Sequence, residues 1–175
     1  MVIESRYHAL YSVSDKWVEN QIKLACVTGY VPLAFGGRLR TPVLSQVIYG
    51  DKMPYKASEE ARSAGNALGQ SYGLLNTRST NAFMEKVWKS KYRLLIKPSS
   101  QIHDAAYFII DNTVGCLKYV NDNLVKEMQW QHLPELKHDV VKLGGELDVF
   151  PNWAKPITIP NNSTKRKIVN LCKGK

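Results

Sequence analysis

The chain has 175 residues, 44% of them hydrophobic, and a formal net charge of +9 at pH 7, which suits one globular domain or part of a larger protein. Its three cysteines are far apart and odd in number, which argues against a disulfide framework and a cysteine metal site. No apolar stretch is long enough for a signal core or a membrane span, so we expect a cytoplasmic protein with no membrane association.

The positive charge is concentrated in two places. Five basic residues and no acid lie between Glu85 and Asp104, and no acid follows Asp148, where further basic residues gather. Such a distribution favours an anionic partner, with nucleic acid first and a membrane surface second. The alternative is a solvated face followed by a frayed tail.

The first predicted element is a helix over about residues 4–28, because its apolar residues recur at helical spacing. We expect a kink near residues 12–14 and a stop at Gly29. The segment that follows, residues 30–43, reads as a small hairpin. Gly36-Gly37 supplies its turn, because glycine adopts the backbone conformations that tight turns need.

A long helical region is predicted after a loop at residues 46–55. Ser58 has the position of an N-cap, and the helical pattern runs from about residue 59 to residue 92. Two abutting helices are as plausible as one helix, because the pattern is interrupted by glycines at a spacing of four, Gly65, Gly69 and Gly73.

Two strand-like runs, residues 94–102 and 105–110, flank His103-Asp104, and a tight hairpin is the simplest interpretation. A helix capped by Asn112 or Thr113 should then run to about Trp130.

Alternation over residues 138–149 indicates a final strand. The basic remainder, residues 154–175, is predicted as a tail that is disordered or contacts phosphates. Helices packed on an antiparallel sheet give an α+β fold class.

The strongest local motif is Gln101-Ile102-His103-Asp104. A carboxylate at a hairpin tip can reach a divalent metal without being buried by its own strands, and oxygen ligands suit Mg²⁺. Two-metal phosphoryl transfer needs at least two carboxylates that converge from different elements. The alternative is a turn aspartate that bonds its own backbone.

A second motif is Arg62, Asn66 and Gln70, which share one helix face at a spacing of four. All three can donate hydrogen bonds, and the minor groove presents acceptors at every base pair. Such a row can contact duplex DNA without reading its sequence. The alternative is an ordinary polar helix face.

A third motif is Gly29-Tyr30-Val31 followed by Gly37-Arg38-Leu39-Arg40-Thr41-Pro42. A hairpin that presents two arginines, Arg38 and Arg40, is a candidate phosphate clamp. Exposed arginines on an ordinary turn are the alternative.

The order of these three motifs resembles the C-terminal half of family A DNA polymerases, the DNA polymerase I type. The resemblance covers about residues 7–153, from the opening helix to Gly144-Gly145 and Asn152-Trp153. Within it, the amino-acid sequence of residues 76–85 is most similar to that of bacteriophage members. It implies an end-of-fingers helix and Gly-Arg hairpin over 1–56, a palm region over 57–153 and the basic tail over 154–175.

The resemblance also implies a reaction, in which a primer 3′-hydroxyl attacks the α-phosphate of a deoxynucleoside triphosphate during DNA replication. Asp104 would bind the two catalytic Mg²⁺ ions, and His103 beside it would touch the primer end. Primer–template DNA would be contacted by the remaining candidate residues, Arg62, Asn66, Gln70, Arg38, Arg40 and Gln101.

Three departures from the family pattern bear on activity. Ala105 stands where the family usually has an acidic residue, and Leu39 interrupts the usual three arginines. The first polymerase motif, with the other metal-binding aspartate, and the nucleotide-binding fingers helix lie upstream in the family and are not in this sequence.

These departures leave three interpretations. In a split polymerase, a second polypeptide supplies the missing motifs, in the host cytoplasm if the source is a phage, and the chain alone is inactive. Otherwise the chain is a non-catalytic module that binds duplex DNA, or a relic without function.

Overall fold

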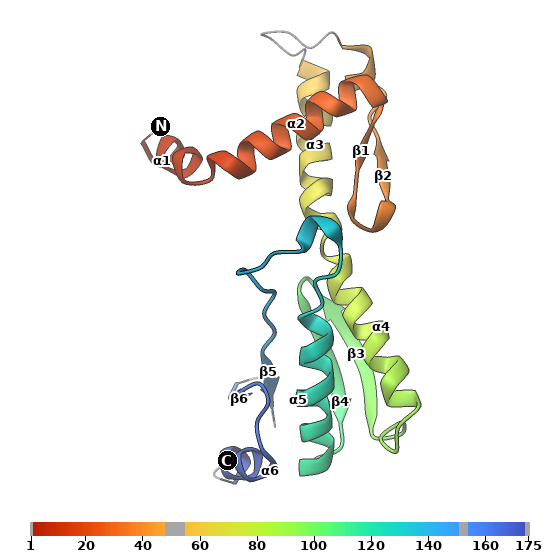
Figure 1. Cartoon of the computed structure of the whole chain (residues 1–175), viewed down its shortest axis with the longest axis vertical. Coiled ribbons are helices and arrows are strands. Elements are labelled where there is room, and N and C mark those ends of the chain that lie inside the picture. The colour runs from red at the N-terminus through yellow and green to blue at the C-terminus, as the bar shows by residue number, and fades with distance from the viewer. Residues whose placement is uncertain (1, 48–54, 151–153, 174–175) are drawn as a thin grey trace. The chain divides into compact units, whose positions relative to one another are not determined.

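The computed structural model describes residues 2–47, 55–150 and 154–173 (Figure 1). The chain divides into two compact units, Met1–Tyr72 and Gly73–Lys175, and the boundary falls inside the segment predicted as a palm region. Within the described ranges, helices and three small antiparallel sheets of two strands each give an α+β fold. No helix in these ranges is both long and apolar enough to cross a membrane.

The first unit opens with two consecutive helices, α1 (Val2–Leu10) and α2 (Ser12–Thr28), which confirms the predicted kink. The second helix ends at Gly29, whose φ of 75° is left-handed and whose N–H donates to the Ala25 carbonyl at 2.9 Å. Glycine adopts this conformation without a Cβ clash, so the predicted stop is confirmed.

The predicted hairpin is present, with shorter strands than expected. Strand β1 (Tyr30–Pro32) pairs antiparallel with β2 (Arg38–Arg40), and a 3₁₀ turn, η1 (Ala34–Gly36), lies in the connection. A second 3₁₀ turn, η2 (Leu44–Gln46), follows. The apolar side chains of this unit gather between α2, the hairpin, η2 and α3 in a core that includes Ile22, Ala25, Val31, Leu44, Ala57, Ala64 and Leu68.

The long helical region consists of two helices, α3 (Tyr55–Ser71) and α4 (Leu74–Trp88), which meet at the boundary between the units. The predicted cap at Ser58 is wrong, because α3 already includes that residue. Near this end of α3, the side chain of Glu60 forms a hydrogen bond to the preceding segment: its Oε2 accepts from the Leu44 N–H at 2.6 Å. Most of the predicted loop at 46–55 lies outside the described residues.

The second unit is built on a hairpin, β3 (Ile96–Ile102) and β4 (Ala105–Ile110), and on helix α5 (Val114–Met128). Thr113 caps α5 by accepting a hydrogen bond from the Cys116 N–H, so Thr113 rather than Asn112 is the cap. Helices α4 and α5 lie along the hairpin (Figure 1). Their shared core includes Phe83, Val87, Ile96, Cys116, Val120 and Leu124.

The predicted strand over residues 138–149 is confirmed only at its end, where β5 (Leu147–Val149) pairs with β6 (Ile157–Ile159). A 3₁₀ turn, η3 (Pro134–Leu136), precedes an irregular segment. Gln131 holds this segment, because its amide donates to the Val141 carbonyl at 3.0 Å and accepts from the Leu143 N–H at 3.2 Å. The backbone of this segment is therefore bonded to a side chain and not to a neighbouring strand.

The basic segment is predicted to be disordered or to contact phosphates; disorder is wrong for most of it, and phosphate contact stays a prediction. After β6, Thr164 caps a further helix, α6 (Lys165–Cys172), by accepting a hydrogen bond from the Lys167 N–H. Ile159 and Ile168 are fully buried in the core of the second unit. The high density of basic residues favoured the prediction of a tail, but burial of these few apolar side chains is enough to hold the segment against the core.

Two ion pairs form around the buried carboxylate of Glu127 at the end of α5. The Glu127 carboxylate lies 2.9 Å from Arg78 Nη1 and also pairs with Lys86 Nζ. Burial raises the pKa of Glu127, but the hydrogen bond and charge of Lys86, with the charge of Arg78, outweigh it and hold the pKa below its usual value. The Arg78 guanidinium also lies over the Trp130 ring, 4.2 Å from its centroid.

We expect Glu127→Gln to lower the free energy of unfolding at pH 7 by about 1–3 kcal/mol, because the charge that pairs with both cations is removed. The loss is smaller than for a fully buried pair, since both cations are partly exposed to solvent. The folded pKa lies below the unfolded value of about 4.3, so this stabilisation is present above that pH. It is lost as the pH falls through the folded pKa. Urea unfolding at neutral and acid pH, with exposed Glu85→Gln as control, should show a difference that shrinks in acid. An equal difference at both pH values would contradict this account.

Candidate active site

The candidate catalytic pair forms the tip of the β3–β4 hairpin. Ile102 pairs with Ala105, so His103 and Asp104 are the whole connection between the two strands. His103 has a φ of 52°, in the left-handed region that two-residue hairpin turns use and that histidine enters more readily than most residues. Both side chains are exposed. The predicted tight hairpin with this pair at its tip is confirmed.

Two hydrogen bonds tie the tip to the beginning of α4. The Asn76 side-chain amide donates to the His103 carbonyl at 3.4 Å, and the Gln101 amide donates to the Thr77 hydroxyl at 3.1 Å. Asn76 is buried, whereas His103 is exposed, so this contact is partly buried. The turn is therefore held by a helix that is packed into the core.

Sequence reasoning missed Asn76 and Thr77. The available signal was a pair of polar residues in the first turn of the helix that follows Gly73, but nothing local identifies their partners. The Asn76–His103 bond spans 27 positions in the chain. Both residues are positioning residues for the turn and have no predicted contact with substrate.

A bulge in β3 decides which way the residues near the tip face. Pro98 lies opposite Phe108, on the side that packs against the helices, and the register shifts between Pro98 and Ser100. After the shift Gln101 lies opposite Ala106, two residues from Phe108 and on the same face. A regular strand would have turned Gln101 away from α4, so the bulge makes its bond to Thr77 possible.

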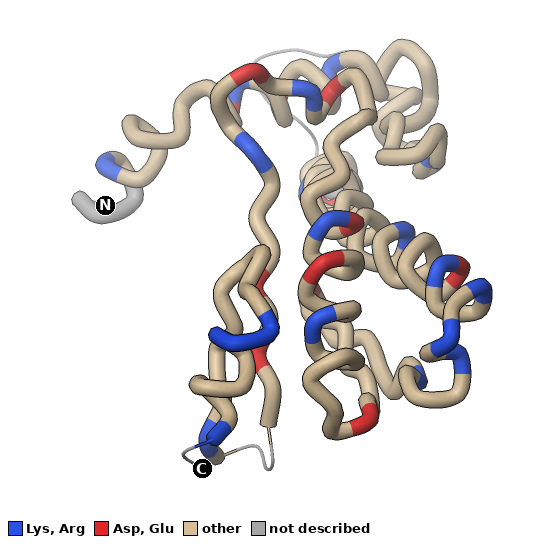
Figure 2. The backbone as a smooth tube through the Cα atoms, turned by 60° about the horizontal axis from the view of Figure 1, so that its bottom comes forward, with Lys and Arg blue, Asp and Glu red and all other residues tan. Residues whose placement is uncertain are grey.

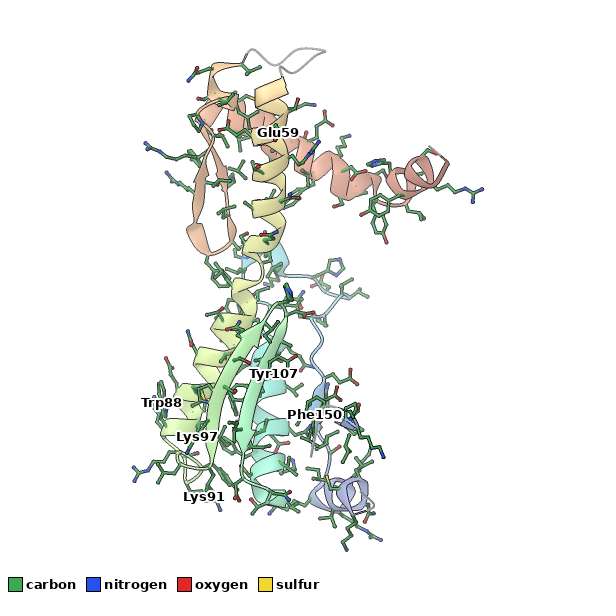
Figure 3. The ribbon with its side chains drawn as sticks, turned by 180° about the vertical axis from the view of Figure 1, so that it is seen from behind. Glu59, Trp88, Lys91, Lys97, Tyr107 and Phe150 are labelled. Carbon is green, nitrogen blue, oxygen red and sulfur yellow. The ribbon has the colours of Figure 1, made fainter. Side chains whose placement is uncertain are left out.

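The opposite face of the hairpin is not covered by α4 or α5. Ile102 and Ile109 are 50% and 66% exposed, and Figure 3 shows the strands in front of α5, with Lys97 and Tyr107 labelled. Ala105, the departure from the family pattern, lies opposite Ile102 at the last pair of the ladder. The hairpin therefore has one packed face and one open, largely apolar face.

The residues at the tip do not complete a metal site. Within the described ranges no group of three or more His, Cys, Asp or Glu side chains is placed to hold a metal ion. Mg²⁺ takes about six oxygen ligands, and two-metal chemistry needs carboxylates from more than one element. Asp104, exposed at the tip, is one carboxylate of the required kind.

The predicted donor row lies on α3 in the first unit. Arg62, Asn66 and Gln70 are all exposed, whereas Ala64 and Leu68 of the same helix are buried. The shared exposed face is confirmed, because the apolar residues turn the other side of the helix into the core. Contact of this face with DNA stays a prediction.

The two arginines of the first unit lie on one face of β2. Arg38 and Arg40 are exposed and Leu39 between them is turned toward the core, as strand alternation requires. Leu39 therefore interrupts the arginine run in sequence but leaves two cations side by side. The Arg38 guanidinium lies over the Tyr30 ring at 4.5 Å from its centroid, which fixes its position.

The candidate residues are thus divided between the units. The first unit carries the predicted duplex-binding side chains of α3 and β2, and the second carries Gln101, His103 and Asp104. Comparison of the chain with protein-family models, with curated proteins and with solved structures found no match.

Proposed function

We propose that this chain is the C-terminal part of a template-directed DNA polymerase of family A type, with a palm-type hairpin that presents Asp104. The observation that carries the proposal is the His103-Asp104 turn, which closes a tight antiparallel hairpin and is bonded to α4. A carboxylate presented in this way is exposed, lies on a turn that is anchored to a helix, and is free of burial by its own strands. These are the properties that a ligand for a substrate-bound cation requires.

In the proposed reaction, a bond forms between the primer 3′-oxygen and the α-phosphorus of a deoxynucleoside triphosphate. The bond from that phosphorus to the pyrophosphate oxygen breaks, and the hydroxyl proton is released. Mg²⁺, when bound, would neutralise charge on the phosphates and favour the ionised 3′-hydroxyl. Asp104 would supply one ligand, and His103 would position the primer end.

The remaining parts of the active site would come from a second polypeptide. It would supply another carboxylate and the helix that binds the triphosphate. The open face of the hairpin supports this requirement, because Ile102 and Ile109 expose apolar surface beside the tip.

The first test is primer extension with Mg²⁺ and deoxynucleotides. The full chain is assayed alone and mixed with the upstream portion of a bacteriophage family A polymerase that contains the first aspartate motif and the fingers helix. We expect extension only in the mixture, and only with the nucleotide complementary to the template. Extension by the upstream portion alone at the same rate would overturn the proposal.

The donor row on α3 gives a separate prediction. The neutral double variant Asn66→Ala/Gln70→Ala should weaken binding to duplex DNA about tenfold, because two hydrogen bonds to the minor groove are lost. The dependence on salt should not change, since no charge is removed. Arg62→Ala should instead lower the slope of log affinity against log salt by about one unit. Binding is measured by fluorescence anisotropy.

Matched controls for this prediction lie in the same unit. Ser63 is an exposed neighbour on α3, and Lys16 is an exposed cation on α2. Ser63→Ala should leave the affinity unchanged, and Lys16→Ala should leave the salt slope unchanged. Equal losses from Lys16→Ala and Arg62→Ala would mean that only net charge matters.

A non-catalytic duplex-binding module is the second candidate. It is favoured by one feature, the location of the donor row and of both arginines in the first unit, which does not contain Asp104. This candidate predicts duplex binding with a steep salt dependence and no extension with any upstream polypeptide.

A further inference from the structure

A basic turn joins α4 to β3 at the opposite end of the hairpin from His103-Asp104. An open hollow of about 540 Å³ lies on it, lined by Trp88, Lys89, Ser90, Lys91, Arg93, Leu94 and Leu95. Trp88 is 63% exposed, and the three cations are exposed as well. Figure 3 places Trp88, Lys91 and Lys97 at this end of the second unit, and Figure 2 shows lysine and arginine positions gathered there.

The turn is built as a fixed structure. The Ser90 hydroxyl donates to the Val87 carbonyl at 2.8 Å and accepts from the Tyr92 N–H at 3.0 Å. The Tyr92 ring packs against Tyr119 of α5, with centroids 4.8 Å apart. A Cβ at Gly115 would lie 3.0 Å from the Tyr92 hydroxyl, so the glycine allows this close approach. The exposed side chains are therefore presented by an ordered backbone.

The cations of this turn are not neutralised by acidic side chains within the described residues. Lys86 pairs with Glu127, but within the described residues Lys89, Arg93 and Lys97 take part in no ion pair. The Lys91 ammonium lies 5.3 Å from the centroid of the Tyr92 ring. The nearest acids along the chain are Glu85, one helical turn before Lys89, and Asp104 at the far tip of the hairpin. Across the hairpin, the Asp111 N–H donates to the Leu95 carbonyl at 2.9 Å. Positive charge dominates the hollow.

We propose that this turn is a binding site for single-stranded nucleic acid, with a base stacked on Trp88 and phosphates held by Lys89, Lys91 and Arg93. An exposed aromatic ring beside unpaired cations is the combination that single strands require, because every base has a face that can stack. A duplex hides those faces.

The site is separate from the candidate active site. The seven residues of β3 lie between them, which at about 3.3 Å per residue places the turn roughly 20 Å from the hairpin tip. It would hold a strand that is not being copied at the tip. An anionic membrane would meet the same cations, and binding of anionic vesicles in place of the homopolymers is the outcome of the test below that would assign the turn to it.

The test uses the full chain and a labelled homopolymer of about ten deoxythymidines, within the usual site size for single strands. Binding is followed by fluorescence anisotropy over a range of salt concentrations. Mg²⁺, primer and nucleotides are omitted, so the result does not depend on polymerase activity. A uridine homopolymer of equal length tests whether the site distinguishes RNA from DNA. Equal binding assigns the site to both nucleic acids, and weaker binding of the uridine homopolymer assigns it to DNA. Either result supports the proposal.

Trp88→Leu should lower the affinity about tenfold or more, because stacking is lost while apolar bulk is kept. Trp88→Phe should remain close to the unmodified chain. The triple variant Lys89→Ala/Lys91→Ala/Arg93→Ala should lower the slope of log affinity against log salt by about two units. The substituted side chains are all exposed, and circular dichroism checks that each variant is folded.

The controls remove the same groups elsewhere. Trp17→Leu removes another partly exposed ring, and Lys126→Ala/Lys137→Ala/Lys142→Ala removes the same charge from exposed positions elsewhere in the second unit. Neither should change the affinity or the slope appreciably. Equal effects of the two triple variants, an unchanged affinity of Trp88→Leu, or binding of phosphatidylserine vesicles without binding of either homopolymer would overturn the proposal.

Discussion

Replacing Asp104 by asparagine is expected to abolish primer extension by the mixture of this chain and the upstream polymerase portion. The rate should fall about a thousandfold or more, because a metal-binding carboxylate supplies several kcal/mol of transition-state stabilisation. Asparagine keeps the shape of the side chain and removes its charge. Because Asp104 is exposed at a turn, the free energy of unfolding should change by no more than about 0.5 kcal/mol.

The control for this prediction is Asp139→Asn. Asp139 is also an exposed aspartate of the second unit, so the charge change is the same. It should leave both extension and duplex binding unchanged. If the two variants retained equal extension rates, Asp104 would have no part in metal binding.

The second large effect concerns the basic C-terminal segment. Ile168→Asp is expected to lower the free energy of unfolding of the second unit by more than about 4 kcal/mol, because it places an unpaired carboxylate in a fully buried site. Urea unfolding followed by circular dichroism measures the change. A loss of this size would confirm in solution that α6 is part of the core.

Asn170→Asp is the matched control, with the same change of charge on an exposed position of α6. It should alter the free energy of unfolding by no more than about 0.5 kcal/mol. Similar effects of the two variants would contradict the docking of α6 and restore the prediction of a disordered tail.

Elements with a strong local signal could be predicted from the sequence. Gly29 ends α2 because glycine alone takes its left-handed conformation without cost. The polar pair Asn112 and Thr113 predicts where α5 begins, and the structure shows which of the two is the cap, Thr113. The β3–β4 hairpin followed from two β-rich runs around a polar pair. In each case the deciding residues lie within a few positions of the feature.

Features that depend on distant partners could not be predicted. The bond from Asn76 to His103, the bulge that turns Gln101 toward α4, and the pairing of Glu127 with Arg78 each join separate elements. Helix α6 is a different case. Thr164 in cap position before apolar residues at helical spacing was a readable signal, but the surrounding lysines and prolines favoured a tail.

The most direct test of the central claim is a competition at a fixed, limiting amount of the upstream polymerase portion. The Asp104→Asn chain is added in increasing proportion to the unmodified chain, and incorporation of one templated deoxynucleotide is measured. We expect incorporation to fall in proportion to the fraction of variant, because the variant occupies the shared complex without supplying the carboxylate. Incorporation that stays constant as the variant replaces the unmodified chain would show that catalysis does not pass through Asp104.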